Sequence, residues 1–145
     1  QDKGRCWPVL RAADCLSNIV KQHGGTIFIS SGDDAREMNA ELINHWPESL
    51  PAPVDVRRVT SEIKNELGLF HFADLFLGIN SFTANLAMNC DLPSIILFHK
   101  KSYMLNYRKN SIGLYPVTGT EIADISNECI KEKIDVFLGP KKINK

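Results

Sequence analysis

The sequence predicts an α/β fold, in which a Rossmann-like parallel sheet of about five strands is covered by helices on both faces as a three-layer sandwich. Two features indicate this. Short runs of almost purely apolar residues alternate with longer segments whose apolar residues recur at helical spacing. Strands that are apolar throughout are buried on both faces, which is typical of parallel strands enclosed by helices. The chain of 145 residues is expected to form a single domain over 1–145.

Helices and strands are expected to alternate through the first half of the chain. Gly24–Gly25 ends the first helix, because glycine adopts the backbone conformation that a helix end requires. Asp33 or Asp34 is expected to cap the second helix, and Thr60 or Ser61 the third, by accepting unpaired N–H groups of the first turn. In order, the expected elements are a helix Pro8–His23, a strand Thr26–Ser30, a loop Ser31–Asp34, a helix ending near Trp46, a strand Val54–Val59 and a helix that contains Ile63 and Leu67.

The second half continues the alternation and holds the most apolar strands. Gly113 and Pro116 fit poorly in a central strand, so the strand that contains them is expected at an edge of the sheet. Tyr103–Arg108 gives no clear pattern. In order, the expected elements are a strand Asp74–Ile79, a turn Asn80–Ser81, a helix Phe82–Asn89, a strand Ser94–Phe98, an edge strand Ile112–Val117 and a helix Thr120–Phe137.

The topology predicts where a ligand would bind. Right-handed crossovers favour the spatial strand order 2-1-3-4-5, with strands numbered along the chain. Sheets of this kind bind ligands beyond the carboxyl ends of their strands, close to the point where the order reverses. The loops at those ends are Ser31–Asp34, Asn80–Thr83 and His99–Lys101. None of them contains a complete G-x-G-x-x-G or P-loop pattern, so neither a dinucleotide fingerprint nor a P-loop is predicted.

The composition limits the classes of function. Seventeen Lys+Arg and 17 Asp+Glu residues give a net charge of zero, which offers no support for nucleic-acid binding. No apolar run reaches the length of a membrane helix, and no secretory signal pattern opens the chain. The four cysteines form no C-x-x-C pair, so they are expected to be buried free thiols in a reducing compartment, the cytoplasm. These cysteines are Cys6, Cys15, Cys90 and Cys129.

The segment Ala73–Phe98 resembles the C-terminal, nucleotide-sugar-binding domain of GT-B glycosyltransferases. It is most similar to the ADP-heptose:lipopolysaccharide heptosyltransferase family, glycosyltransferase family nine, in which a strand is followed by a D-S-G-x-x-H-L-A-like turn, a helix, a proline and an apolar strand. Here Asn80 stands at the Asp position, Ser81 at the Ser, Phe82 at the Gly and Asn85 at the His, while Leu86, Ala87 and Pro93 match directly. Upstream, Lys3, Arg5 and Trp7–Pro8 resemble the family's basic loop before a Trp-Pro helix start.

The resemblance implies an activity for the longer protein. It implies glycosyl transfer from a nucleotide diphospho-sugar in lipopolysaccharide biosynthesis, with this chain as the donor-binding half and the isolated chain inactive. The acceptor, a saccharide or lipid-linked saccharide, would bind an N-terminal domain that precedes Gln1. The first strand of the family's C-terminal domain would also precede Gln1, so that either a central position of the sheet is empty or two strands pair that normally do not. No metal or other cofactor is implied, and the location is cytoplasmic, with peripheral association with the inner membrane left open.

The resemblance also implies a set of donor-binding residues, for which simpler roles exist. The helix start near Phe82 would offer backbone N–H groups to a diphosphate, and the Ser81 and Thr83 hydroxyls would add donors. Lys3 and Arg5 would neutralise the departing nucleotide diphosphate. Asn80 and His99 would line the same crevice. The simpler alternatives are helix caps for Ser81 and Thr83, solvated cations for Lys3 and Arg5, and a surface histidine for His99.

The departures from the family pattern leave two other functions open. Phe82 replaces a glycine that lets the backbone approach a phosphate, and Asn80 replaces a carboxylate. These changes favour a non-catalytic, flavodoxin-like binding or regulatory module. A nucleotide-sugar enzyme of the same architecture, such as an epimerase, is the third alternative, because a fold alone does not determine a reaction.

Overall fold

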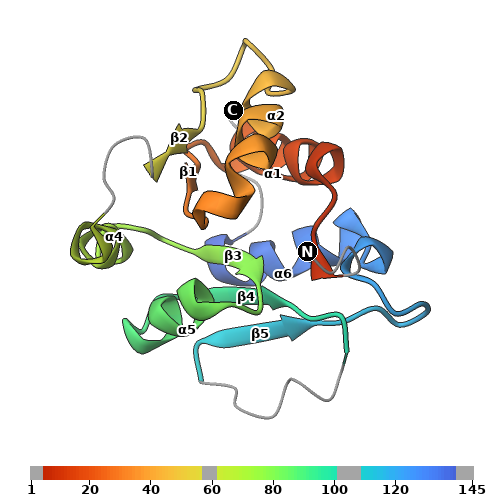
Figure 1. Ribbon diagram of the computed structural model, residues 1–145. Coiled ribbons are helices and arrows are strands. Elements are labelled where there is room, and N and C mark those ends of the chain that lie inside the picture. The colour runs from red at the N-terminus through yellow and green to blue at the C-terminus, as the bar shows by residue number, and fades with distance from the viewer. Residues whose placement is uncertain (1–4, 57–61, 101–108, 140–145) are drawn as a thin grey trace. The chain divides into compact units, whose positions relative to one another are not determined.

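The computed structural model describes residues 5–56, 62–100 and 109–139 (Figure 1). They fall into two compact units. One unit contains residues 67–139 together with the segment up to residue 7, and the other contains residues 8–66. The helix α4 (Ile63–Phe70) includes the boundary between the units.

The unit of residues 8–66 contains a short parallel strand pair and two packed helices. Its elements are α1 (Val9–His23), β1 (Phe28–Ile29), the 3-10 turn η2 (Asp33–Ala35), α2 (Arg36–Asn44) and β2 (Val54–Asp55). In the pair, Phe28 lies opposite Val54 and Ile29 opposite Asp55. The helices α1 and α2 pack on one another. One strand–helix–strand repeat of the predicted fold is therefore present in this unit.

The unit of residues 67–139 contains a three-stranded parallel sheet in the order β3-β4-β5 (Figure 1). Its elements are β3 (Phe76–Ile79), α5 (Phe82–Asn89), β4 (Ser94–Leu97), β5 (Ser111–Leu114), the 3-10 turn η4 (Ile122–Asp124) and α6 (Asn127–Leu138). The central strand β4 is fully buried along its whole length. An apolar strand without an exposed face needs cover on both sides, and helices provide it.

Side chains of β4 alternate between two covered faces of the sheet. Ile96 and Phe98 form one buried cluster with Ala84 of α5, and Met88 packs against it. Side chains alternate along a strand, so Ile95 points to the opposite face. The helix α6 contacts β4, and its Ile130 is fully buried. The three layers predicted from the sequence are thus formed around β4.

The predicted fold class is confirmed. All five expected strands are present, and every pairing among them is parallel. The helix predicted over Phe82–Asn89 has these bounds, and β5 lies at an edge of its sheet, as Gly113 and Pro116 predicted. Cys15 is buried, the other three cysteines are partly buried, and all four are free thiols. No helix among the described residues combines the length and apolarity needed to cross a bilayer.

The strand pairings agree with the predicted order within each unit, as β1-β2 and as β3-β4-β5, and a pairing of the first strand with the third is not among those of the described residues. Three details of the prediction are wrong. The first is the length of the β1-β2 pair, in which only two residues of each strand are paired.

The second error is the helix predicted over Thr120–Phe137. It is divided into η4 and α6, because Asp124 accepts backbone N–H groups of Thr120 and Glu121, both at 3.0 Å, and Ser126 then starts a new helix. The third error is the cap of α2. Asp33 lies inside η2 and pairs with Arg36 at 3.7 Å, and α2 has no side-chain cap. The predicted caps Thr60 and Ser61 lie outside the described residues.

Truncating the buried side of α6 should weaken the fold far more than truncating its exposed side. Ile130→Ala removes a fully buried side chain and should lower the free energy of unfolding by about 2–5 kcal/mol, from lost burial and a residual cavity. Val136→Ala, on the same helix but 66% exposed, should change it by less than about 0.5 kcal/mol. Urea unfolding followed by circular dichroism measures both. Equal losses in the two variants would contradict the packing of α6 described above.

Candidate functional site

The start of α5 is the best-defined part of the predicted donor site. Ser81 is its N-cap, and the Ser81 Oγ accepts the backbone N–H of Ala84 at 3.2 Å. Asn80 continues the strand ladder, donating its backbone N–H to the Leu97 carbonyl at 3.1 Å. The capping role that sequence reasoning offered as the simpler alternative for Ser81 is therefore present. The cap uses only the Ala84 N–H and leaves the earlier backbone N–H groups of the first turn without a partner from Ser81.

Two backbone N–H groups at this helix start have no partner among the described residues. They belong to Phe82 and Thr83, which precede the first residue capped by Ser81. The first turn carries no acidic side chain, so the positive end of the helix dipole is not neutralised locally. Such a helix start attracts anions, because unpaired N–H groups and the dipole act on the same position.

The parallel register brings a second predicted residue to the same edge of the sheet. Ile79 lies opposite Leu97, and both strands end at these residues. Ser81 and His99 each lie two residues beyond this pair, on neighbouring strands. Neighbouring strands are separated by about 4.8 Å, so the ends of β3 and β4, from which the chain continues to Ser81 and His99, lie side by side. His99 is partly buried.

Phe82 stands where the family pattern has glycine, and its side chain does not pack into the core. It is 64% exposed, so the aromatic ring occupies the solvent side of the helix start. Asn85, at the pattern's His position, donates its Nδ2 to the Ser81 carbonyl at 3.0 Å. Asn85 therefore stabilises the first turn instead of projecting a titratable ring.

The basic residues of the N-terminal segment are only partly described. Arg5 is exposed and belongs to the same compact unit as α5. Lys3 lies outside the described residues. The structure therefore places the segment Asn80–Thr83 and His99 at the ends of neighbouring strands, and the binding roles of all these residues, like those of Lys3 and Arg5, stay predictions from the resemblance.

A polar cluster in the other unit was not identified from the sequence. The Asn39 side chain on α2 donates to Ser31 Oγ at 2.7 Å and to Asp55 Oδ2 at 3.3 Å. Asn39 and Asp55 are both buried. One amide therefore joins α2 to the carboxyl ends of β1 and β2. Its place on the helix gave no signal in the sequence, because asparagine on a helix is usually exposed.

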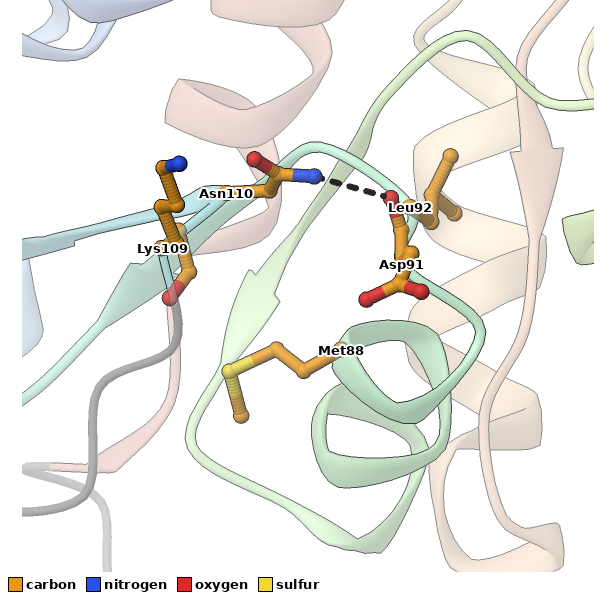
Figure 2. Close-up of a pocket in the computed structure, with 6 residues that line it drawn as sticks. Met88, Asp91, Leu92, Lys109 and Asn110 are labelled. Carbon is orange, nitrogen blue, oxygen red and sulfur yellow. Dashed lines mark hydrogen bonds between the residues drawn. The ribbon is translucent and has the colours of Figure 1, made fainter.

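A pocket of about 400 Å³ opens within the unit of residues 67–139, away from the predicted site (Figure 2). It lies at the amino ends of β4 and β5 and at the C-terminal end of α5, whereas the predicted donor site lies at the opposite ends of these strands. Sequence reasoning did not identify it. Its lining residues are Met88, Asp91, Leu92, Lys109, Asn110 and Ser111.

The described residues contain no group of three or more His, Cys, Asp or Glu side chains suited to a metal ion. The predicted donor site in particular brings together an amide, two hydroxyls, an aromatic ring and one histidine. Its chemistry is that of hydrogen-bond donors around an unneutralised helix start, which suits an anionic ligand.

Comparisons with known proteins identify the fold. No family model matches the sequence, and no curated protein matches it. Among solved structures, the chain is similar to E. coli heptosyltransferase WaaC with ADP, with a TM-score of 0.73 and 14% identity over 94% of this chain and 41% of that one. It is also similar to E. coli heptosyltransferase WaaC with ADP-2-deoxy-2-fluoro heptose, with a TM-score of 0.66, 14% identity and coverage of 94% and 40%. The chain thus has the heptosyltransferase-like fold and spans about two fifths of those chains' length.

Removing the bridging amide should destabilise the unit of residues 8–66. Asn39→Ala leaves the buried Asp55 carboxylate without one of its hydrogen-bond donors, which should cost about 1–3 kcal/mol in the free energy of unfolding. Asn44→Ala, at the exposed end of the same helix, is the matched control and should cost less than about 0.5 kcal/mol. Chemical unfolding measures the difference between the variants. A loss in Asn39→Ala no larger than in the control would show that the bridge contributes nothing.

Proposed function

We propose that this chain is the donor-binding half of a sugar transferase and that it holds a nucleotide diphospho-sugar at the start of α5. The observation that carries the proposal is the pair of unpartnered N–H groups of Phe82 and Thr83 at a helix start without acidic residues. A diphosphate matches this position in charge and in hydrogen-bonding capacity. The position lies at the carboxyl edge of a parallel sheet, where folds of this class bind ligands.

The comparisons support the proposal at the level of the fold. The two similar structures are of a heptosyltransferase solved with ADP and with an ADP-sugar analogue. A nucleotide diphospho-sugar contains the diphosphate that the α5 start suits, so fold and local chemistry point to the same ligand class. The identity of 14% leaves the sugar, the base and the reaction itself to experiment.

The remaining predicted residues receive roles from their chemistry. Ser81 retains the cap and keeps the first turn rigid, so that the N–H groups of Phe82 and Thr83 are oriented before the ligand arrives. His99, at the end of the neighbouring strand, would donate a hydrogen bond to the nucleotide diphospho-sugar. Lys3 and Arg5 would neutralise the charge on the leaving nucleotide diphosphate.

A non-catalytic binding module is the second candidate, and Phe82 favours it. Its exposed ring occupies space at the helix start through which a phosphate would reach the backbone, and the glycine of the family pattern would leave that space open. The two candidates differ in nucleotide affinity. The transferase half binds nucleotide diphosphates, and the module does not.

Nucleotide diphosphates should raise the melting temperature of the isolated chain. A ligand that binds only the folded state stabilises it by about 2.7 kcal/mol at a hundredfold excess over its dissociation constant. A thermal-shift series with ADP, UDP, GDP and CDP measures this, with the nucleoside monophosphates as controls for the second phosphate. No shift with any diphosphate would support the non-catalytic module.

A carboxylate at the α5 cap should weaken nucleotide binding without unfolding the protein. Aspartate caps helices as well as serine does, so Ser81→Asp should preserve stability. Its negative charge lies where the diphosphate would bind, and it should weaken affinity at least about tenfold. Ser126→Asp makes the same change at the N-cap of α6 and should leave affinity unchanged. Titration calorimetry with the diphosphate that stabilises most compares them, and equal affinities in the two variants would overturn the assignment of the site.

We also propose that the chain acts as part of a longer two-domain protein, as the resemblance implies. The support is the edge of β3 that no strand of its own unit, residues 67–139, pairs with. Phe76 and Asn80 donate their N–H groups to β4, so those of Leu77 and Ile79 face the other side, where no strand pairs with them among the described residues. The strand is wholly apolar and carries none of the charged or proline residues that protect natural edges.

A longer form of the protein should protect this edge. Hydrogen–deuterium exchange at the Leu77 and Ile79 amides should be fast in the isolated chain and at least about a hundredfold slower in a form extended at the N-terminus, because a paired strand amide exchanges only on opening. The Ile95 amide, in the central strand, is the control for global stability. Equal exchange of Leu77 and Ile79 in both forms would contradict the proposal that further chain covers β3.

A further inference from the structure

The pocket at the amino ends of β4 and β5 is built from one compact unit and is independent of the proposed donor site (Figure 2). Its volume of about 400 Å³ lies within the range of sites that bind small molecules. Two segments line it, one at the end of α5 and one at the start of β5. The Asn110 Nδ2 donates to the Asp91 carbonyl at 3.5 Å, which links the two sides.

The polar groups around this pocket are available to a ligand. Asp91 and Lys109 carry opposite charges, yet neither side chain forms an ion pair or hydrogen bond among the described residues. The Asn110 Oδ1 likewise accepts no hydrogen bond there. The pocket therefore presents a carboxylate acceptor, an ammonium donor and an amide. Met88, which is partly buried, supplies an apolar surface beside them, whereas the Leu92 side chain packs in the core with Phe70 and Ala87.

Asp91 adopts a backbone conformation that disfavours its side chain. Its φ of 56° makes it the one non-glycine residue with a positive φ among the described residues. Glycine would take this conformation without strain. In Figure 2 the Asp91 carboxylate points into the space between the loop and Met88. This conformation ends α5, since the Leu92 N–H donates to the Ala87 carbonyl at 3.2 Å.

We propose that this pocket binds a saccharide, as a second carbohydrate site on the opposite edge of the sheet from the proposed donor site. A sugar hydroxyl both donates and accepts hydrogen bonds, so neighbouring hydroxyls match the Asp91 carboxylate and the Lys109 ammonium together. The C–H face of a pyranose matches the apolar side chain of Met88, which is only partly buried. The opposite charges of Asp91 and Lys109 give the pocket no net charge, so it does not select for an anion or for a cation.

The site suits weak recognition of a glycan. It is open to solvent, since Asp91, Lys109 and Asn110 are exposed. Open sites with few hydrogen bonds bind in the millimolar range. A second carbohydrate site would hold a glycan chain on the protein without occupying the α5 start. Its existence does not depend on the proposed transferase activity, because no residue is shared between the two sites.

The test is nuclear magnetic resonance titration of the 145-residue chain with methyl glycosides of glucose, galactose, mannose and N-acetylglucosamine. Saturable shifts should appear at the amides of Met88–Leu92 and Lys109–Ser111. Asp91→Gly should weaken binding at least about tenfold, because a charge-assisted hydrogen bond is lost. The same variant should leave the melting temperature unchanged or higher, because the backbone strain is relieved. Asn89→Ala, exposed on α5 and not part of the lining, is the control and should bind as the parent does.

Each other outcome counts against the proposal. Absence of saturable shifts with all four glycosides would overturn it. Shifts confined to the amides of Asn80–Thr83 and His99 would assign the sugar to the donor site instead. Glycine, as a zwitterion, and inorganic phosphate serve as charged probes. If either binds more strongly than the glycosides, the ligand is a charged molecule and not a saccharide. Undiminished binding in a folded Asp91→Gly variant would remove the carboxylate from the site.

Discussion

Parallel pairing of β3 and β5 with the central strand β4 is the interaction on which the candidate sites depend. Because Ser94–Leu97 is buried on both faces, the strand holds one register with each neighbour, and that register is continuous from Phe76↔Ser94 to Ile79↔Leu97. A shift of one residue would reverse which side chains meet α5 and α6. The same register aligns the strand ends, and it therefore places the α5 start beside His99 and the pocket at the opposite edge.

The two ends of α5 have different chemistry although the helix has only eight residues. At its start, Ser81 satisfies one backbone N–H and leaves those of Phe82 and Thr83 unpartnered among the described residues, so this end is suited to an anion. At its other end, the chain turns through Asp91 with a positive φ and leads directly into β4. The eight residues of α5, at 1.5 Å per residue, span about 12 Å, so the carboxyl ends and the amino ends of the strands are separated by about this length of helix.

The sequence was sufficient for the elements whose signal is local. The apolar run at Ser94–Phe98 and the Ser81 cap predicted β4 and α5, because burial and capping depend on residues close in the chain. The strand that pairs with the other side of β3 was not predictable in this way, because strand pairing depends on which strands are available to pair. The break before α6 was not predicted, because the apolar residues on both sides of it keep helical spacing, whereas the Asp124 carboxylate accepts two backbone N–H groups and interrupts the helix.

The candidate sites followed the same division between local and non-local information. The α5 start was predictable, since a turn after an apolar strand fixes where a helix begins and hence where its free N–H groups lie. The pocket was not, because it needs Asp91 and Asn110, which are 19 residues apart, to meet across two strand starts. The buried bridge from Asn39 to Asp55 likewise joins residues 16 apart. At Phe82 the sequence pattern and the structure point in different directions. Its position in the pattern indicates a phosphate-binding turn, but its exposed ring occupies part of the space that a phosphate would need there. Nucleotide affinity at the α5 start is therefore the property that separates a transferase half from a binding module on the same fold.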